Sequence, residues 1–295
     1  MTLERAEAAT TIAAPEAIAT SRRVLRSILA SPTATLGIVL IVLLLLAAIL
    51  APVISPYDPI AQDIAQRLLP PSAAHWLGTD GFGRDMLSRL IFGTRPSLSL
   101  LALVVATSLP IGLLVGICAG FSGGWVERAL MRFTDIVMAF PQLVLALAFV
   151  AILGPGLINS ALALTITGWP AYARQARTEA AAIRQSDFLA AAQMAGIAGP
   201  RLLFGHVLPL VLPGAIIRVA LDLGGIILNA AALGFLGLGV QPPTPEWGTM
   251  VSDGTKVIFD QWWIAAAPGA AILIASLAFN LLADGLRDIL DPRRD

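Results

Sequence analysis

The strongest constraint on this chain is a series of six apolar segments, each close to the length needed to cross a lipid bilayer. Hydrophobic residues make up 57% of the sequence and charged residues only 13%, whereas about a quarter of the residues in a soluble domain are charged. A transmembrane helix needs about 20 predominantly apolar residues. The candidate spans are residues 36–54, 98–119, 134–153, 156–173, 212–238 and 263–283. Because a backbone in lipid must satisfy its own hydrogen bonds, these segments predict an all-α membrane protein with six transmembrane helices.

The distribution of basic residues predicts how these helices are oriented. With a cytoplasmic N-terminus, most of the nineteen Lys and Arg residues fall on the cytoplasmic side of the membrane, as positively charged loops generally do. Residues 190–209, between the fourth and fifth spans, then lie in the cytoplasm. Nineteen acidic residues balance the nineteen basic ones, so no global charge favours binding to nucleic acid.

Residues 186–209 carry the signals of a short helix, a turn and a second short helix. Ser186 is a good N-cap, and Asp187 falls in the first turn, where the helix dipole favours a negative charge. Gly196 is placed to end this helix in a left-handed conformation, and Pro200 suits the first turn of the next one. Three consecutive residues of high helix propensity lie between them: Ala190, Ala191 and Ala192. The pattern predicts a helix on the membrane surface, suited either to seating in a groove of a partner or to connecting two spans.

The spacing from these alanines through Gly196 to Pro209 resembles the "EAA" loop in the membrane subunits of ABC importers. Other segments resemble the peptide/opine/nickel branch of these permeases, and within it the C-subunit type of dipeptide or oligopeptide permease. These segments are HWLGTDGFGRD (75–85), LSRLIFG (87–93), GGW (123–125), LGFLGLG (233–239), PEWG (245–248) and DGLRD (284–288). Their order and spacing extend the resemblance over nearly the whole chain.

The resemblance implies a type I ABC-importer permease fold, in which the cytoplasmic loop is a coupling helix that contacts an ATPase. Such a permease is a non-catalytic subunit of a bacterial inner-membrane complex. Its implied partners are a second permease subunit, two ATP-binding subunits that carry ATP and Mg, an extracytoplasmic substrate-binding protein and membrane lipid. The chain has no GxxxxGK[ST] phosphate loop of its own, and we expect it to hold no cofactor or metal. The residues expected in the coupling loop are Asp187, Ala190, Ala191, Ala192, Gly196, Arg201 and Pro209.

The loop departs from the family pattern at two positions. Ala190 stands where the family has an acidic residue, and His206 stands where it has an aliphatic one. The coupling role therefore does not depend on a salt bridge from position 190. Asp187 and Arg201 are expected to supply polar contacts to the partner instead.

The resemblance also implies a division of the chain. A cytoplasmic tail (1–27) precedes a first transmembrane helix with an extracytoplasmic segment (28–94), the permease domain (95–288) and a cytoplasmic C-terminus (289–295). Short peptides are the expected substrates, because two distant histidines and one cysteine do not suggest a path for a metal. Opines, glutathione and nickel complexes are the alternatives within the same branch.

Several polar residues interrupt the apolar spans. Asp222 follows Arg218 by four residues, and Asp135 follows Arg132 by three, so each pair is expected to form an ion pair on one helix face. An ionisable residue inside a span is also a candidate functional residue. The candidate lining residues of a substrate path are Gln142, Asp222 and Asn229.

Glycines recur every four residues in the second span. Gly112, Gly116 and Gly120 form a flat stripe on one helix face, which allows the backbone of another helix to approach closely. We interpret this stripe as a packing surface.

Two unrelated functions remain as remote alternatives. Residues 120–124 match the GxSxG pattern of serine hydrolases, and His206 is predicted to lie on the same side of the membrane as Ser122, so the two residues would suit an intramembrane serine protease. The pattern lacks the strand–turn–helix context of a hydrolase. The Arg218–Asp222 pair would also suit a proton-coupled secondary transporter, but we find no inverted repeat of the kind such transporters contain.

Overall fold

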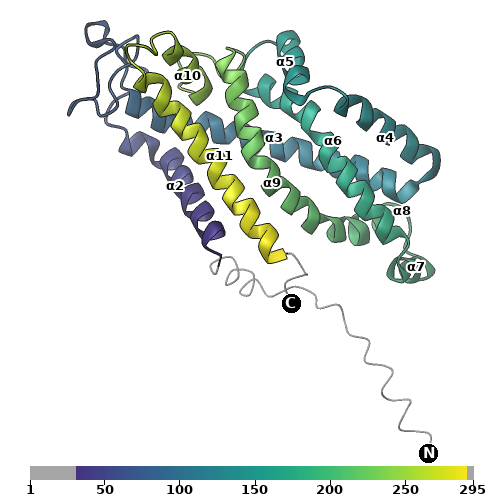
Figure 1. The fold of residues 1–295 in the computed structure, drawn as a ribbon. Helices are drawn as coiled ribbons and strands as arrows, with labels where there is room; N and C mark the ends of the chain where they lie inside the picture. The colour runs from purple at the N-terminus through teal and green to yellow at the C-terminus, as the bar shows by residue number, and fades with distance from the viewer. Residues whose placement is uncertain (1–30, 291–295) are drawn as a thin grey trace, which may run out of the picture.

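The structure, a computed structural model, describes residues 31–290 and is almost entirely helical (Figure 1). Over that range the β-type pairing is limited to an isolated bridge between Thr79 and Asp85. The helices are α2 (Pro32–Ile54), η2 (Ile64–Gln66), α3 (Met86–Ser122), α4 (Gly124–Met138), α5 (Gln142–Leu153), α6 (Leu157–Arg184), α7 (Asp187–Met194), α8 (Gly199–Leu202), η3 (Leu203–Val207), α9 (Leu208–Phe235), α10 (Trp247–Thr255) and α11 (Trp263–Leu290). The predicted N-terminal tail and all but the start of the predicted C-terminal segment lie outside the described residues.

Four helical segments in the described part of the chain are long and apolar enough to cross a membrane. They are residues 32–54, 86–122, 199–235 and 263–287. A fifth span exists if α4 and α5 are counted together, although these two helices are bent by 87° at the break between them. The helix α6 is long enough to cross a membrane but is not among the four apolar spans, because polar residues interrupt its apolar half. The predicted count of six spans is therefore only partly reproduced.

The break between α4 and α5 corrects the prediction of one span over residues 134–153. Pro141 is the N-cap of α5, with φ −56° and ψ 125°. A proline disfavours helical geometry in the residue before it, here Phe140, and cannot donate a backbone hydrogen bond. The apolar run is therefore divided into the end of α4 and a separate helix α5.

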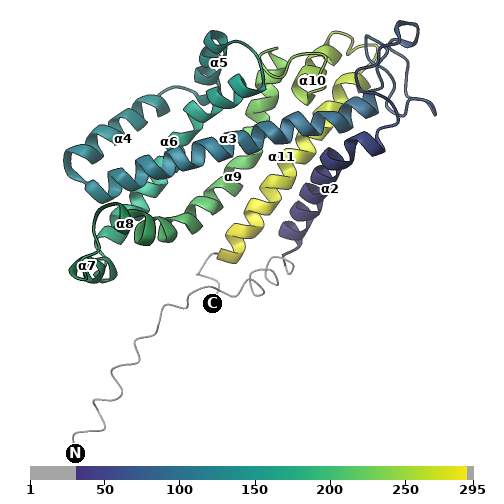
Figure 2. The same ribbon diagram turned by 180° about the vertical axis from the view of Figure 1, so that it is seen from behind.

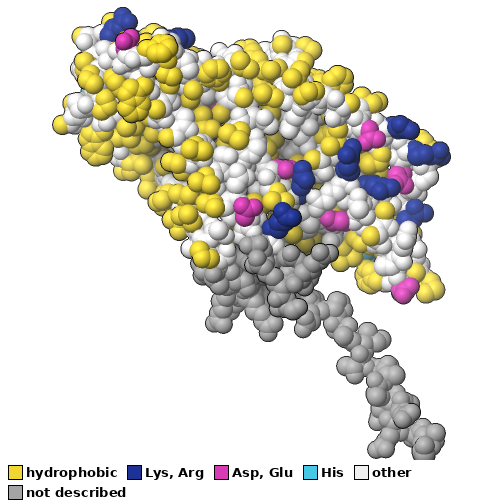
Figure 3. All heavy atoms as spheres, in the orientation of Figure 1, with side chains coloured by type: hydrophobic (Ala, Val, Ile, Leu, Met, Phe, Trp, Pro, Cys, Tyr) yellow, Lys and Arg dark blue, Asp and Glu magenta, His cyan; other side chains and the backbone are white. Residues whose placement is uncertain are grey.

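The helices alternate in direction as the order of the spans predicts. Figures 1 and 2 place the start of α2, the end of α11 and the short helix α7 toward one side of the bundle. The segment 55–85 and α10 lie toward the opposite side. Figure 3 shows apolar side chains over α2 and the neighbouring face, whereas charged side chains gather near α4 and the end of α6.

The glycine stripe of α3 is a packing surface, as predicted, and the structure shows that its partner is α6. A Cβ at Gly116 would lie 2.7 Å from the Cβ of Ala176, and a Cβ at Gly120 would lie 3.0 Å from that of Ala180. A Cβ at Gly112 would likewise overlap the backbone of α6. Only glycine allows the two backbones to approach this closely, so the stripe fixes the α3–α6 pair at the centre of the bundle.

The segment between α2 and α3 is held by buried charged groups. Asp80 Oδ2 accepts a hydrogen bond from Arg84 Nε at 2.7 Å and lies 3.4 Å from Arg89 Nε. Asp85 caps α3 through the backbone N–H of Ser88 and contacts His75 Nδ1 at 2.9 Å. Paired buried charges avoid the large cost of an isolated one, so these contacts anchor the loop on the first turns of α3.

Candidate coupling loop and transport cavity

The helix α7 has the local geometry that its sequence predicts. The Ser186 hydroxyl accepts a hydrogen bond from the N–H of Leu189 at 3.4 Å, and Asp187 lies in the first turn. Gly196 follows the helix with φ +82°, and Pro200 lies in the first turn of α8. A side chain at position 196 would meet no other atom within 4 Å, so the glycine is required by its backbone conformation and not by lack of space.

The two sides of α7 face different surroundings. Leu189 is buried, and Ala192 packs beside it against a cluster that includes Leu202 and Val207. The side opposite this contact carries Asp187, Ala190, Ala191 and Met194, all of which are exposed. Three of these side chains are small or flexible, so a partner could approach this helix closely.

The remaining residues of the predicted loop lie beside α7. Arg201 is exposed on α8, and Pro209 is exposed in the first turn of α9. His206 lies in the π-helical turn η3, where its ring is 6.1 Å from that of Phe188. Its Nδ1 atom is buried and has no hydrogen-bond partner among the described residues. His206 therefore joins α7 to the base of α9 by packing.

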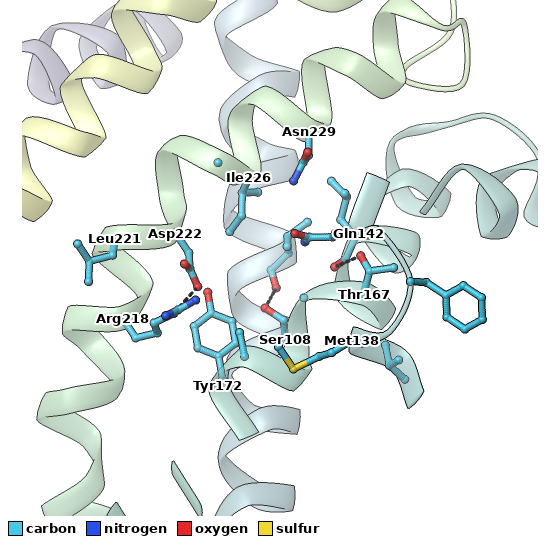
Figure 4. Close-up of a pocket in the computed structure, with 17 residues that line it drawn as sticks. Ser108, Met138, Gln142, Thr167, Tyr172, Arg218, Leu221, Asp222, Ile226 and Asn229 are labelled. Carbon is cyan, nitrogen blue, oxygen red and sulfur yellow. Dashed lines mark hydrogen bonds and ion pairs between the residues drawn. The ribbon is translucent and has the colours of Figure 1, made fainter. Parts of the chain in front are cut away.

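A cavity of about 400 Å³ lies between α3, α6, α9 and the junction of α4 with α5 (Figure 4). Its lining includes all three residues selected from the sequence: Gln142, Asp222 and Asn229. Val104, Leu164 and Ile226 add apolar walls. The structure thus brings the three residues around one space, although their role in transport remains a prediction.

The predicted ion pair of α9 is formed at one end of this cavity. Arg218 Nε donates to Asp222 Oδ2 at 3.0 Å. Tyr172 of α6 is 3% exposed, and its hydroxyl points toward this pair without a hydrogen bond of ordinary geometry. Sequence reasoning missed Tyr172, because a tyrosine in an apolar run carries no signal that separates cavity lining from helix packing.

The second predicted ion pair is wrong. Asp135 pairs with Arg174 of α6, with 2.8 Å between Oδ1 and Nη2, and not with Arg132 on its own helix. About two turns earlier, Glu127 of α4 pairs with Arg177 of α6. Because both arginines project from α6 toward α4, they link the two helices across a groove.

The serine-hydrolase pattern falls at the turn between two helices. Ser122 is the last residue of α3, and Gly123 has φ +66° where the chain turns into α4. His206 Nδ1 has no hydrogen-bond partner among the described residues, so this atom does not pair with Ser122. The glycines of this pattern therefore have a structural use in the turn.

Comparison with known families agrees with this arrangement. Residues 112–295, more than half of the chain, match the model described as "Binding-protein-dependent transport system inner membrane component". The chain belongs to this family. Residues 20–71 also match the "N-terminal TM domain of oligopeptide transport permease C". The permease is therefore a multi-pass inner-membrane transport subunit of the C-subunit type, as the sequence motifs predicted.

Curated relatives cover most of this permease. It is 47% identical to the "Probable D,D-dipeptide transport system permease protein" of Escherichia coli (strain K12), over 80% of each chain. It is 48% identical to the "Di/tripeptide transport system permease protein" of Pseudomonas aeruginosa (strain UCBPP-PA14), again over 80% of each chain. It is also 42% identical to the "Nickel transport system permease protein" of Escherichia coli (strain K12), over 80% of this chain and 85% of the relative.

A solved structure supports the fold. The permease superposes on a chain of the MetNI methionine ABC transporter in an inward-facing conformation, with a TM-score of 0.57 and 17% identity. The match covers 69% of this chain and 97% of the other. The predicted ABC-importer permease fold is thereby confirmed.

Proposed function

We propose that this permease is the non-catalytic membrane subunit of an ATP-driven importer of short peptides. The observation that carries the proposal is the similarity to dipeptide and di/tripeptide permeases over 80% of the chain. The cavity between α3, α6 and α9 supports it, because its lining combines apolar walls with a few polar side chains, as small-molecule sites generally do. Domain boundaries near residues 28, 95 and 289 remain part of this proposal.

The permease is oriented with its N-terminus, α7 and the end of α11 in the cytoplasm. The arginines near α4, the end of α6 and α8 favour this orientation under the positive-inside rule. The segment 55–85 and α10 then face an extracytoplasmic substrate-binding protein. A second permease subunit and two ATPase subunits complete the complex.

Coupling occurs through the exposed face of α7. ATP and Mg are bound by the ATPase subunits, whose closure displaces α7 and the residues packed behind it. Leu189 transmits this displacement, because it is buried against the residues at the base of α9. The helices α6 and α9 line the cavity, so their movement opens it alternately to each side of the membrane as rigid bodies.

The coupling role is tested by adding a charge and bulk to the exposed face of α7. Ala191→Glu should leave membrane insertion unchanged and reduce ATP-driven uptake of dialanine by about tenfold or more, because a buried unpaired charge in an interface costs several kcal/mol. Gln193→Glu is the matched control, since it adds the same charge to an exposed side of the same helix without enlarging it. Assembly of the ATPase with the purified membrane subunits and uptake in proteoliposomes provide the measurements; full uptake by Ala191→Glu would disprove the assignment.

Nickel transport is the second candidate, because a relative named as a nickel permease is 42% identical. Uptake of dialanine and of nickel by the complete transporter distinguishes the two. Groups of three or more metal-ligating side chains do not occur within residues 31–290. Nickel uptake without peptide uptake would overturn the peptide proposal in favour of this second candidate.

A further inference from the structure

Several polar groups around the cavity have unused hydrogen-bonding capacity. Tyr172 is buried, and its hydroxyl lies beside Asp222 without a hydrogen bond of ordinary geometry. The side-chain amides of Gln142 and Asn229 have no hydrogen-bond partner among the described residues, and Arg218 contacts Asp222 through Nε alone. Gln142 and the Arg218 side chain are exposed and Asn229 is half-buried, so these groups are open to a solute. Tyr172, by contrast, lies in the interior, where a polar group without a good partner costs free energy. Their convergence on one space therefore points to a ligand that pairs with them.

The polar groups are arranged along the cavity in two sets. Arg218, Asp222 and Asn229 occur at intervals of four and seven residues on α9, so they lie on one helix face. Figure 4 shows Tyr172 beside the Arg218–Asp222 pair, with Gln142 and Asn229 farther along the cavity. The charged groups thus lie at one end and the neutral amides at the other, with Ile226 between them.

The charges at the first end sum to zero. Asp222 is the acidic residue, and Arg218 the basic one, in the described lining. A free metal ion would meet one carboxylate that is already neutralised, whereas a solute with both a negative and a positive group adds no net charge. Isolated charges inside a membrane are costly, so a cavity of this composition favours a net-neutral dipolar ligand.

We infer that this cavity is a transient binding site for a zwitterionic, peptide-like solute, whose carboxylate is held by Arg218 and the Tyr172 hydroxyl. The guanidinium offers its Nη donors in the planar geometry that suits a carboxylate. Asp222 orients the guanidinium through Nε and offers its carboxylate to the ammonium group of the same solute. Gln142 and Asn229 provide donors and acceptors for amide groups. The inference deepens the proposed peptide transport and rests on it.

The test uses the complete transporter in proteoliposomes, with labelled dialanine as the probe and ATP hydrolysis measured in the same sample. Arg218→Gln should reduce the amount of dialanine transported per ATP hydrolysed by about tenfold, and Tyr172→Phe by a smaller factor, because each removes a donor to a charged group. Loss of coupling with retained hydrolysis is expected, since neither residue is part of the α7 surface. Asp135→Asn is the matched control, because it breaks another ion pair of this bundle outside the cavity. An unchanged ratio in Tyr172→Phe, whether uptake and hydrolysis fall together or neither falls, would overturn the inference.

A charge exchange separates binding from helix packing. Arg218→Asp combined with Asp222→Arg restores an ion pair at the same spacing on α9 but moves each charge by one turn. A purely structural pair would regain the wild-type ratio of transport to hydrolysis, and that result would also overturn the inference. If wild-type transporter carries nickel but no dialanine, the proposed function itself fails; if it carries dialanine and the variants match it, only the binding site fails.

Discussion

The helices α3 and α4 both pack against α6, but they do so through opposite kinds of contact. The α3–α6 contact is formed by glycines that meet alanines and backbone atoms directly. The α4–α6 contact depends on Glu127–Arg177 and Asp135–Arg174, which cross a groove between the two helices. The first contact tolerates no added atom, whereas water and counter-ions can replace the second. We therefore expect α3 and α6 to move as one body and α4 to be free to shift against them.

The largest loss of stability is expected from a substitution at the α3–α6 contact, where the two helix backbones touch. Gly116→Val places a branched side chain in space occupied by Ala176 and the backbone of α6. Overpacking costs about 1–3 kcal/mol where side chains can adjust, and here the obstructing atoms belong to a helix backbone. We expect the purified complex to melt at a clearly lower temperature or to fail to assemble. Gly225→Val is the control, because a Cβ at position 225 meets nothing within 4 Å; equal behaviour of the two variants would contradict the comparison.

Sequence patterns predicted contacts within one helix better than contacts between helices. The capping by Ser186, the left-handed Gly196 and the Arg218–Asp222 pair each depend on residues a few positions apart, whose geometry follows from the helix itself. The partner of Asp135 lies 39 residues away. A packed helix bundle can place either Arg132 or Arg174 beside Asp135. The way α4 crosses α6 in the structure makes Arg174 the partner.

The bend in the third span and the transport cavity were hard to predict for a related reason. A proline in an apolar run ends a helix, kinks it or is tolerated, depending on its neighbours, so Pro141 alone did not predict an 87° bend. Gln142, Asp222 and Asn229 were recognised as polar residues in apolar segments. Tyr172 became a candidate only when α6 placed it beside Asp222.

A smaller loss of stability is expected from a substitution at the α4–α6 contact. Glu127→Gln removes the charge that pairs with Arg177 while keeping a side chain of similar size. These side chains are 22% and 39% exposed, so the pair should contribute about 0.5–1 kcal/mol after solvent screening. We expect a modest fall in melting temperature that largely disappears at high salt. A loss as large as that of Gly116→Val would show that α4 is held as firmly as α3.

The contact between α9 and α10 combines a closely packed glycine with an ionisable side chain. Changing it should alter the melting temperature least, and by an amount that depends on pH. A Cβ at Gly234 would lie 2.8 Å from the carboxyl carbon of Glu246, whose side chain caps α10 by accepting hydrogen bonds from the N–H groups of Gly248 and Thr249. Burial raises the pKa of the Glu246 carboxyl above its ordinary value, although these hydrogen bonds oppose the shift. Because the folded protein favours the protonated carboxyl, this group stabilises the fold at pH values below its ordinary pKa, and that contribution is lost as the pH rises through the raised value.

Glu246→Gln should remove this dependence. The amide keeps the size of the side chain and one acceptor oxygen but cannot ionise, so the variant should gain melting temperature relative to wild type as the pH increases from about 4 to 7. Other titrating groups are common to both proteins and cancel in the difference. If the difference in melting temperature between Glu246→Gln and wild type stays constant across that range, the carboxyl is ionised at no cost in its buried position. The close approach of Gly234 would then determine this contact, as the glycines do in the α3–α6 pair.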